Sequence, residues 1–202
     1  MNDRSALHTA TRIAAGDDKT NYDNVAISLH WATAFLVLFQ FASAETWDWF
    51  SKPTQETMQS LHVSFGILLT AVIVARVVWR LIPGHQRPSI VSGWIESASK
   101  AVHYFLYALL VVQAGLGFAF RWAQKEPLSF FGLFAIPSPL GVVDKATRHT
   151  LHGLHEKVGW AIIIIALGHS LAALYHHYKL HDRVLGRMLP LARRSERDAP
   201  VG

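Results

Sequence analysis

Histidine is the residue type in this chain best able to do chemistry, and several of its 12 histidines lie inside apolar stretches. The segment HGLHEKVGWAIIIIALGHS, residues 152–170, has histidines at both ends of a run that resembles a membrane span. His155 and His169 are 14 residues apart, which places them on one helix face, roughly 21 Å apart along the axis. Two unrelated polar residues near two interfaces would give the same pattern, so the rest of the chain has to decide.

Four stretches that lack Asp, Glu, Lys and Arg are long enough to cross a bilayer as helices. A spanning helix needs about 20 apolar residues, and the lack of a two-residue alternation argues against strands. With their flanks, these stretches predict spans at about residues 25–44, 57–81, 101–120 and 155–178. We therefore expect an all-α integral membrane protein, a four-helix bundle.

The polar segments divide the chain into three parts. We expect a polar cytoplasmic leader over residues 1–24, a transmembrane domain over 25–190 and a disordered cytoplasmic tail over 191–202. Residues 42–44, Ala-Ser-Ala, resemble a signal-peptide cleavage site. The apolar run before them is too long for a signal peptide and follows a polar leader, so cleavage there is disfavoured.

The distribution of Lys and Arg predicts that both termini are cytoplasmic. The leader, the 76–100 connection and the tail from Lys179 carry three, four and six basic residues, whereas the 45–56 and 121–157 connections carry one and five. Basic flanks concentrate on the cytoplasmic side of a membrane, and this role explains the net charge of +5 better than nucleic-acid binding does. The absence of cysteine excludes disulfides, iron–sulfur clusters and covalent c-type haem attachment.

This orientation sorts four intramembrane histidines into two levels. His62 and His155 lie toward the outer face, and His30 and His169 lie toward the cytoplasmic face. An imidazole in lipid is costly unless it has a partner. Two imidazoles at one depth on facing helices are what a six-coordinate b-type haem requires. We therefore predict that these two pairs are the iron ligands of an outer and an inner haem b.

Four other residues strengthen this hypothesis, each with an alternative explanation. Gly66 and Gly159 each follow an outer histidine by four residues, which leaves room for a flat macrocycle, although small residues also pack helices in membranes. Arg76 lies at the inner haem's depth, where a haem propionate or a quinone-site group could balance its charge; it could instead extend to the headgroups. His103 could donate to a propionate or a quinone oxygen, or be a plain interfacial residue.

A second arrangement of histidines suggests a different metal. His149, His152 and His155 follow one another at intervals of three residues and could bind zinc. The spacing suits one helix face only loosely, and no fourth ligand is obvious. Zinc is therefore the weaker interpretation.

Several short motifs, in this order, resemble the bacterial cytochrome b561 proteins over roughly residues 23–190. They are ISLHW in the first span, LHVSFGILL and RVVWRL in the second, and LHEKVGW and LGHS in the fourth. The resemblance implies a four-helix, di-haem protein of the bacterial inner membrane that transfers electrons with ubiquinone. The family's ligand pattern falls on His30, His62, His155 and His169.

The outer loop, KEPLSFFGLFAIPSPLG, also resembles the apolar outer loop of the family. Its phenylalanines would cap the outer haem or rest on the membrane interface: Phe130, Phe131 and Phe134. Some family members are described as superoxide oxidases, which pass an electron from superoxide to quinone. A surplus of basic residues in the outer loop could steer such an anion, although long loops cross the membrane regardless of charge: Arg121, Lys125, Lys145, Arg148 and Lys157.

Together these observations predict transmembrane electron transfer through two b-type haems. The expected acceptor is ubiquinone and the expected donor is a periplasmic one such as superoxide, which would make the protein a membrane oxidoreductase. The alternative is the cytochrome b subunit of a larger hydrogenase or dehydrogenase complex. A third hypothesis is a transporter without haem, whose histidines relay protons or bind a metal.

Overall fold

The computed structural model describes residues 23–83, 93–181 and residue 185. All but the last two residues of the expected leader, and the whole of the expected tail, lie outside this part of the chain. The described residues are mostly helical. Four of their helices are long and apolar enough to cross a membrane, as the charge-free runs predict: α2 (Asn24–Thr46), α3 (Lys52–Leu81), α4 (Trp94–Ala123) and α5 (Lys145–Tyr178).

Aspartates begin two of these helices. Asp23 Oδ1 accepts from the backbone N–H of Ala26 at 2.7 Å, and Asp144 Oδ1 accepts from that of Thr147 at 2.9 Å. Each carboxylate thus pairs with one of the free N–H groups of a helix start. Asp23 also accepts from the indole N–H of Trp79. It therefore ties the beginning of α2 to the last turns of α3.

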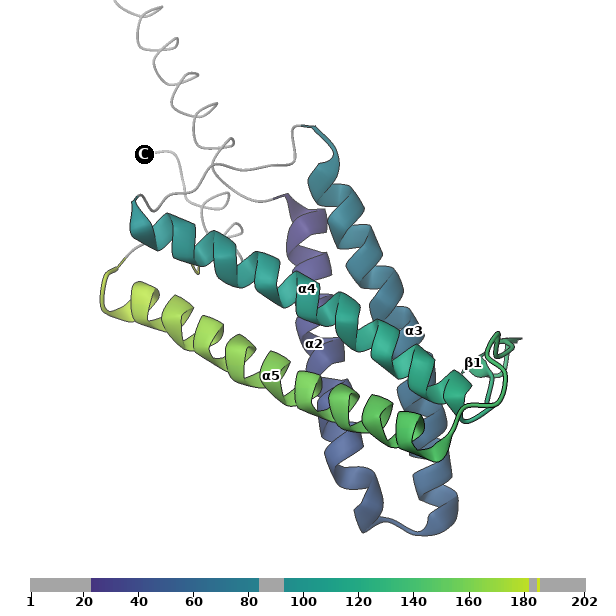
Figure 1. The fold of residues 1–202 in the computed structure, drawn as a ribbon. Coiled ribbons are helices and arrows are strands. Elements are labelled where there is room, and N and C mark those ends of the chain that lie inside the picture. The colour runs from purple at the N-terminus through teal and green to yellow at the C-terminus, as the bar shows by residue number, and fades with distance from the viewer. Residues whose placement is uncertain (1–22, 84–92, 182–184, 186–202) are drawn as a thin grey trace, which may run out of the picture.

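The helices form two antiparallel pairs (Figure 1). A short 3-10 helix, η1 (Trp47–Trp49), joins α2 to α3, and the segment 124–144 joins α4 to α5. Packing is most extensive within each pair, and the α4–α5 pair crosses obliquely over the α2–α3 pair (Figure 1). Each predicted histidine pair therefore combines one residue from each helix pair.

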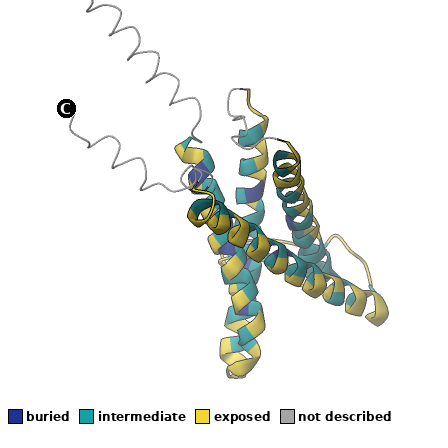
Figure 2. Ribbon diagram, turned by 90° about the vertical axis from the view of Figure 1, so that its left-hand side faces the viewer, coloured by how far each residue is buried: buried dark blue, intermediate teal, exposed yellow. Residues whose placement is uncertain are grey.

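The interior is small, and most apolar side chains face outward. Ile73, Leu110 and Ile162 form a buried cluster contributed by α3, α4 and α5. Exposed and half-buried residues cover most of the four helices (Figure 2). An outward apolar surface of this extent suits helices that are solvated by lipid chains.

A two-stranded antiparallel ribbon in the outer loop is the part of the described chain that departs from an all-α fold. β1 (Leu128–Phe130) pairs with β2 (Phe134–Ile136). Ser64 on α3 fixes this ribbon, because its hydroxyl accepts from Phe131 N at 3.0 Å. Its single proton is shared between Ser129 O at 3.1 Å and Ser60 O at 3.0 Å. The ring of Phe131 also lies 5.1 Å from that of Phe65.

Candidate functional site

The two outer histidines lie next to each other although they come from different helix pairs. His62 is on α3 and His155 is on α5, and their ring centroids are 6.3 Å apart with an interplanar angle of 77°. Both side chains are half-buried. Trp47 closes one side of this pair, since its ring lies 5.4 Å from that of His62.

The hydrogen bonds of Ser43 determine which nitrogen of His62 is free. Ser43 Oγ lies 2.9 Å from Gln40 O and 3.3 Å from His62 Nδ1. A carbonyl oxygen can only accept, so the single hydroxyl proton goes to Gln40. The hydroxyl must then accept from an N–H at His62 Nδ1, which leaves a lone pair on Nε2.

His155 reaches the same state through a backbone group. Its Nδ1 lies 3.2 Å from the carbonyl oxygen of Gln113 on α4. Because this oxygen can only accept, Nδ1 carries the proton and Nε2 carries the lone pair. The Gln113 amide nitrogen lies 3.3 Å from that Nε2. Both outer histidines therefore have their lone pair on Nε2, and in this structure the lone pair of His155 accepts from the Gln113 amide.

This arrangement fits an iron ion held between two axial imidazoles. A metal–imidazole bond is about 2 Å long, so rings on opposite sides of one ion have centres roughly 6 Å apart. The 6.3 Å between the His62 and His155 centroids agrees with that separation. The donor set fits as well, because neutral imidazoles in a helix bundle are the usual axial ligands of b-type haem.

The predicted glycines lie against the glutamine side chains of the neighbouring helices. A Cβ atom at Gly66 would come within 3.0 Å of Gln40 Nε2, and one at Gly159 within 3.2 Å of Gln113 Nε2. A third glycine, Gly117 on α4, has the closest contact to a predicted ligand, because a Cβ there would lie 3.0 Å from His155 Cε1. These glycines give neighbouring polar side chains room to reach the outer histidines.

The two inner histidines have different partners. The Arg76 guanidinium donates to His30 Nδ1 at 3.3 Å, and the His103 ring lies 4.8 Å from that of His169. The structure thus places Arg76 beside His30 and His103 beside His169.

Two arginines of α3 lie over two tyrosines of α4 at this inner level. Arg76 Cζ is 5.1 Å from the ring centroid of Tyr107, and Arg80 Cζ is 5.5 Å from that of Tyr104. The ion pairs found among the described residues join other side chains, Lys100 with Glu96 and Arg121 with Glu126. The charge of Arg76 is therefore stabilised by an aromatic face and not by a carboxylate within residues 23–83 and 93–181.

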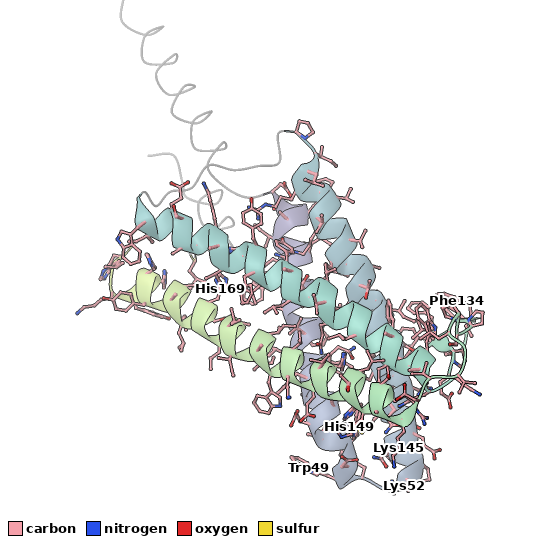
Figure 3. The ribbon with its side chains drawn as sticks, in the orientation of Figure 1. Trp49, Lys52, Phe134, Lys145, His149 and His169 are labelled. Atoms are coloured by element: carbon pink, nitrogen blue, oxygen red, sulfur yellow. The ribbon has the colours of Figure 1, made fainter. Side chains whose placement is uncertain are left out.

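The row of histidines at the start of α5 splits into residues with separate surroundings. The His152 ring lies 4.9 Å from that of Phe120, while His155 points to His62. Across the described ranges, no group of three or more His, Cys, Asp or Glu residues is arranged to hold a metal ion. Figure 3 shows His149 close to Lys145 at the start of α5 and His169 toward the other end of the same helix.

The residues that orient the outer histidines are not among those predicted from the sequence. Ser43 and Gln40 lie in the first span, and Gln113 lies in the third. A signal was present, because uncharged polar residues are uncommon in apolar spans and usually have a partner there. The identity of that partner depends on which helices pack together, and a single sequence does not give this.

Known proteins resemble this chain over most of its length. A family model described as prokaryotic cytochrome b561 matches residues 21–191. Cytochrome b561 homolog 2 of Escherichia coli (strain K12) is 33% identical over 178 residues, which cover 83% of this chain and 90% of that protein. The probable superoxide oxidase CybB of Yersinia pestis is 28% identical over 176 residues, 85% of this chain and 97% of that protein. Cytochrome b562 of Cereibacter sphaeroides is 25% identical over 174 residues, 83% of this chain and 94% of that protein.

Proposed function

Because this chain belongs to the prokaryotic cytochrome b561 family, we propose that it carries electrons across the bacterial inner membrane by means of two b-type haems. His62 and His155 hold the outer haem, and His30 and His169 hold the inner one. A bound haem supplies a one-electron couple, and two of them at different depths give electrons a path through the bilayer. The proposed electron acceptor is ubiquinone.

One observation carries this proposal. At the outer level, two histidines from separate helix pairs each have Nδ1 hydrogen-bonded to an oxygen, with ring centroids 6.3 Å apart. Such second-sphere bonds fix the ring orientation of metal-binding histidines and make Nε2 more basic. A proton-relay histidine would instead be expected to exchange protons at both nitrogens.

The inner level supports a site where a quinone takes up protons. His103 Nδ1 lies 2.7 Å from the carbonyl oxygen of Ser99, so Nδ1 carries a proton and neutral His103 has an acceptor at Nε2. His103 can therefore donate to a quinone oxygen only after Nε2 has gained a proton from the cytoplasmic side. The nearby Arg76 guanidinium stabilises negative charge on a reduced quinone or on a haem propionate.

Superoxide is the proposed donor at the outer level, by analogy with the name of the Yersinia relative. Each superoxide ion loses one electron and becomes dioxygen. Two such electrons and two protons reduce one ubiquinone to ubiquinol, so electrons and protons balance. Superoxide oxidation at the outer face and proton uptake at the inner face both require that the two termini lie in the cytoplasm, as the basic flanks predict.

Three exposed lysines make the outer charge available to an incoming anion. Lys125, Lys145 and Lys157 are exposed, whereas Arg121 is paired with Glu126 at 3.5 Å. Changing the three lysines to Gln should slow haem reduction by superoxide in stopped-flow experiments and weaken its salt dependence. Lys179→Gln, at the other end of α5, is the matched control. An unchanged rate would rule out steering by these lysines.

The spectrum of the purified protein tests the proposed function. We expect a strong Soret band, sharp α and β bands after reduction, and two irons per chain. A well-folded preparation that stays colourless after it is supplied with haemin would contradict the proposal and favour the transporter hypothesis. One iron per chain would contradict the presence of two haems.

A second candidate, the cytochrome b subunit of a larger redox complex, is favoured by the exposed tip of the ribbon. Leu133 is 78% exposed and Phe134 is 50% exposed, and such apolar side chains can dock a partner as well as lipid. Purification in mild detergent distinguishes the two functions. A large redox subunit that copurifies stoichiometrically would support the second, and rapid superoxide oxidation by the isolated chain would support the first.

A further inference from the structure

One turn of α2 holds His62 at two points. The Gln40 amide donates to the backbone oxygen of His62 at 2.9 Å, and the Ser43 hydroxyl accepts from its ring at 3.3 Å. The backbone and the ring of one residue are thus both tied to the same neighbouring helix. Rotation of the His62 side chain would break the second of these bonds.

We propose that Ser43 is a positioning residue of the outer site, whose hydroxyl fixes the ring of His62 and makes it a stronger iron ligand. The inference rests on the proposed function, since it concerns how His62 holds a haem. His155 donates the equivalent hydrogen bond from Nδ1–H to the backbone oxygen of Gln113. Because a backbone oxygen cannot be changed by substitution, Ser43 is the side chain that can be replaced to alter the hydrogen bonding at an outer Nδ1.

The surroundings of Ser43 make this bond difficult to replace. Ser43 is only 9% exposed, so water has little access to His62 Nδ1 from that side. A hydrogen bond from Nδ1–H to an oxygen increases the electron density at Nε2. A more basic axial ligand favours ferric over ferrous iron, and removal of the hydroxyl should therefore raise the midpoint potential of the outer haem.

Ser43 also differs from an ordinary serine in a membrane helix. Ser170 on α5 donates to Ala166 O at 2.8 Å, one turn back in its own helix, and is exposed. Ser43 donates to Gln40 O within its own helix as well, but its oxygen is shared with a histidine of α3. Ser170 is therefore a matched control for loss of a hydroxyl from a span.

The test compares Ser43→Ala, Ser43→Thr and Ser43→Val in the full-length, haem-loaded protein. Thr and Val have nearly the same shape, so a difference between them reports the hydroxyl. Spectroelectrochemical titration gives the potential of the outer haem, which is identified as the one lost in His155→Ala. We expect Ala and Val to weaken ferric relative to ferrous binding by up to about tenfold, which equals about 59 mV for a one-electron couple. Thr should stay near the wild-type value.

Each result has one meaning. Loss of the outer haem from Ser43→Ala, with its retention in Ser43→Thr and Ser170→Ala, would also support the proposal. Equal potentials for Thr and Val, or equal shifts in Ser43→Ala and Ser170→Ala, would overturn it. Absence of haem from the wild-type protein would refute the proposed function instead, so the two failures are distinguishable.

Discussion

The outer and inner levels of this molecule surround their histidines in opposite ways. At the outer level, His62 and His155 each donate a hydrogen bond from Nδ1–H to an uncharged oxygen. At the inner level, His30 accepts a hydrogen bond at Nδ1 from the cationic Arg76. A guanidinium has donors only, so in that contact Nδ1 of His30 carries no proton and the neutral ring has its N–H at Nε2. To hold a haem iron through Nε2, His30 would have to leave this contact with Arg76 and take the other tautomer.

The difference indicates a division of labour between the two levels. Rings held by neutral acceptors are oriented before a metal arrives, which is what rapid and specific ligation requires. A site that combines an arginine with His103 and His169 is rich in groups that carry charge or protons. Under the proposed function, both levels hold a haem, and the inner level in addition handles the charge of a quinone.

Removal of one ligand should have the largest effect and tests the pairing directly. His155→Ala should lose the outer haem and keep the inner one, and His169→Ala should do the reverse. Each variant would therefore contain one iron per chain, measured by metal analysis and the haem absorbance. If either change removed both haems equally, the pairing by depth would be wrong.

A methyl group beside a ligand should be the next largest disturbance. In Gly117→Ala the new Cβ would lie 3.0 Å from His155 Cε1, whereas a Cβ at Gly115 would meet nothing within 4 Å. Disturbed second-sphere positions cost metal sites about 10-fold or more in affinity. We expect a loss of that size for Gly117→Ala in haem titration, and none for Gly115→Ala. Similar affinities in both variants would show that the ring tolerates displacement.

Loss of a cation should affect the inner level alone. Arg76→Gln removes a positive charge next to His30 and should lower the inner haem's midpoint potential, because a nearby cation favours the ferrous state. A tenfold change in the ferrous-to-ferric ratio corresponds to about 59 mV, and we expect at least this shift. Arg80→Gln, which removes the guanidinium over Tyr104, should shift the potential less. Equal shifts in both variants would contradict a specific role for Arg76.

A smaller effect is expected at the ribbon of the outer loop. Ser64→Ala removes the acceptor of Phe131 N–H and the hydroxyl proton that Ser129 O shares with Ser60 O, at a position that is 1% exposed. Leaving such groups unsatisfied costs about 1–3 kcal/mol. The ribbon should become sensitive to limited proteolysis while the inner haem's spectrum stays unchanged. Ser170→Ala is the control. Equal protection of the ribbon in both variants would contradict the role of Ser64 in holding it.

The smallest effect concerns the helix start outside the membrane. The hydroxyl and the backbone N–H of Thr147 hold the pKa of Asp144 below its usual value. The stabilisation of the helix start by the Asp144 carboxylate is therefore complete at neutral pH. It is lost only as the pH falls through that lowered pKa. Between pH 5 and 8, Asp144→Ala should increase hydrogen exchange at the start of α5 by a constant factor, after correction for intrinsic rates. A factor that decreases toward pH 5 would contradict the lowered pKa of Asp144.

The sequence predicts the four helices well because a bilayer imposes a strong requirement. A chain must keep about 20 consecutive residues free of charge to cross it, and α2 matches its predicted span closely. α3, α4 and α5 extend beyond theirs: α5 begins at Lys145, ten residues before the predicted start at 155. Polar helical turns outside the membrane carry no such signal.

The ribbon and the contacts of the outer histidines could not be predicted for a different reason. β1 and β2 have three residues each and turn through Phe131 and Gly132 at positive φ, which is too short for a recognisable alternation. Depth places His62 level with His155, but the bond from His62 to Ser43 depends on how α2 is rotated about its axis. The predicted roles of Gly66 and Gly159 beside a macrocycle stay predictions.

The packing of α2 with α3 and of α4 with α5 has a consequence for assembly. Each proposed prosthetic group would take one ligand from each half of the protein. It would add to the contacts that already join the two halves, which are the cluster of Ile73, Leu110 and Ile162 and the hydrogen bonds of Ser64. Two fragments, divided between Leu81 and Trp94 and synthesised separately in one cell, should then find each other. Their union should depend on the supply of porphyrin.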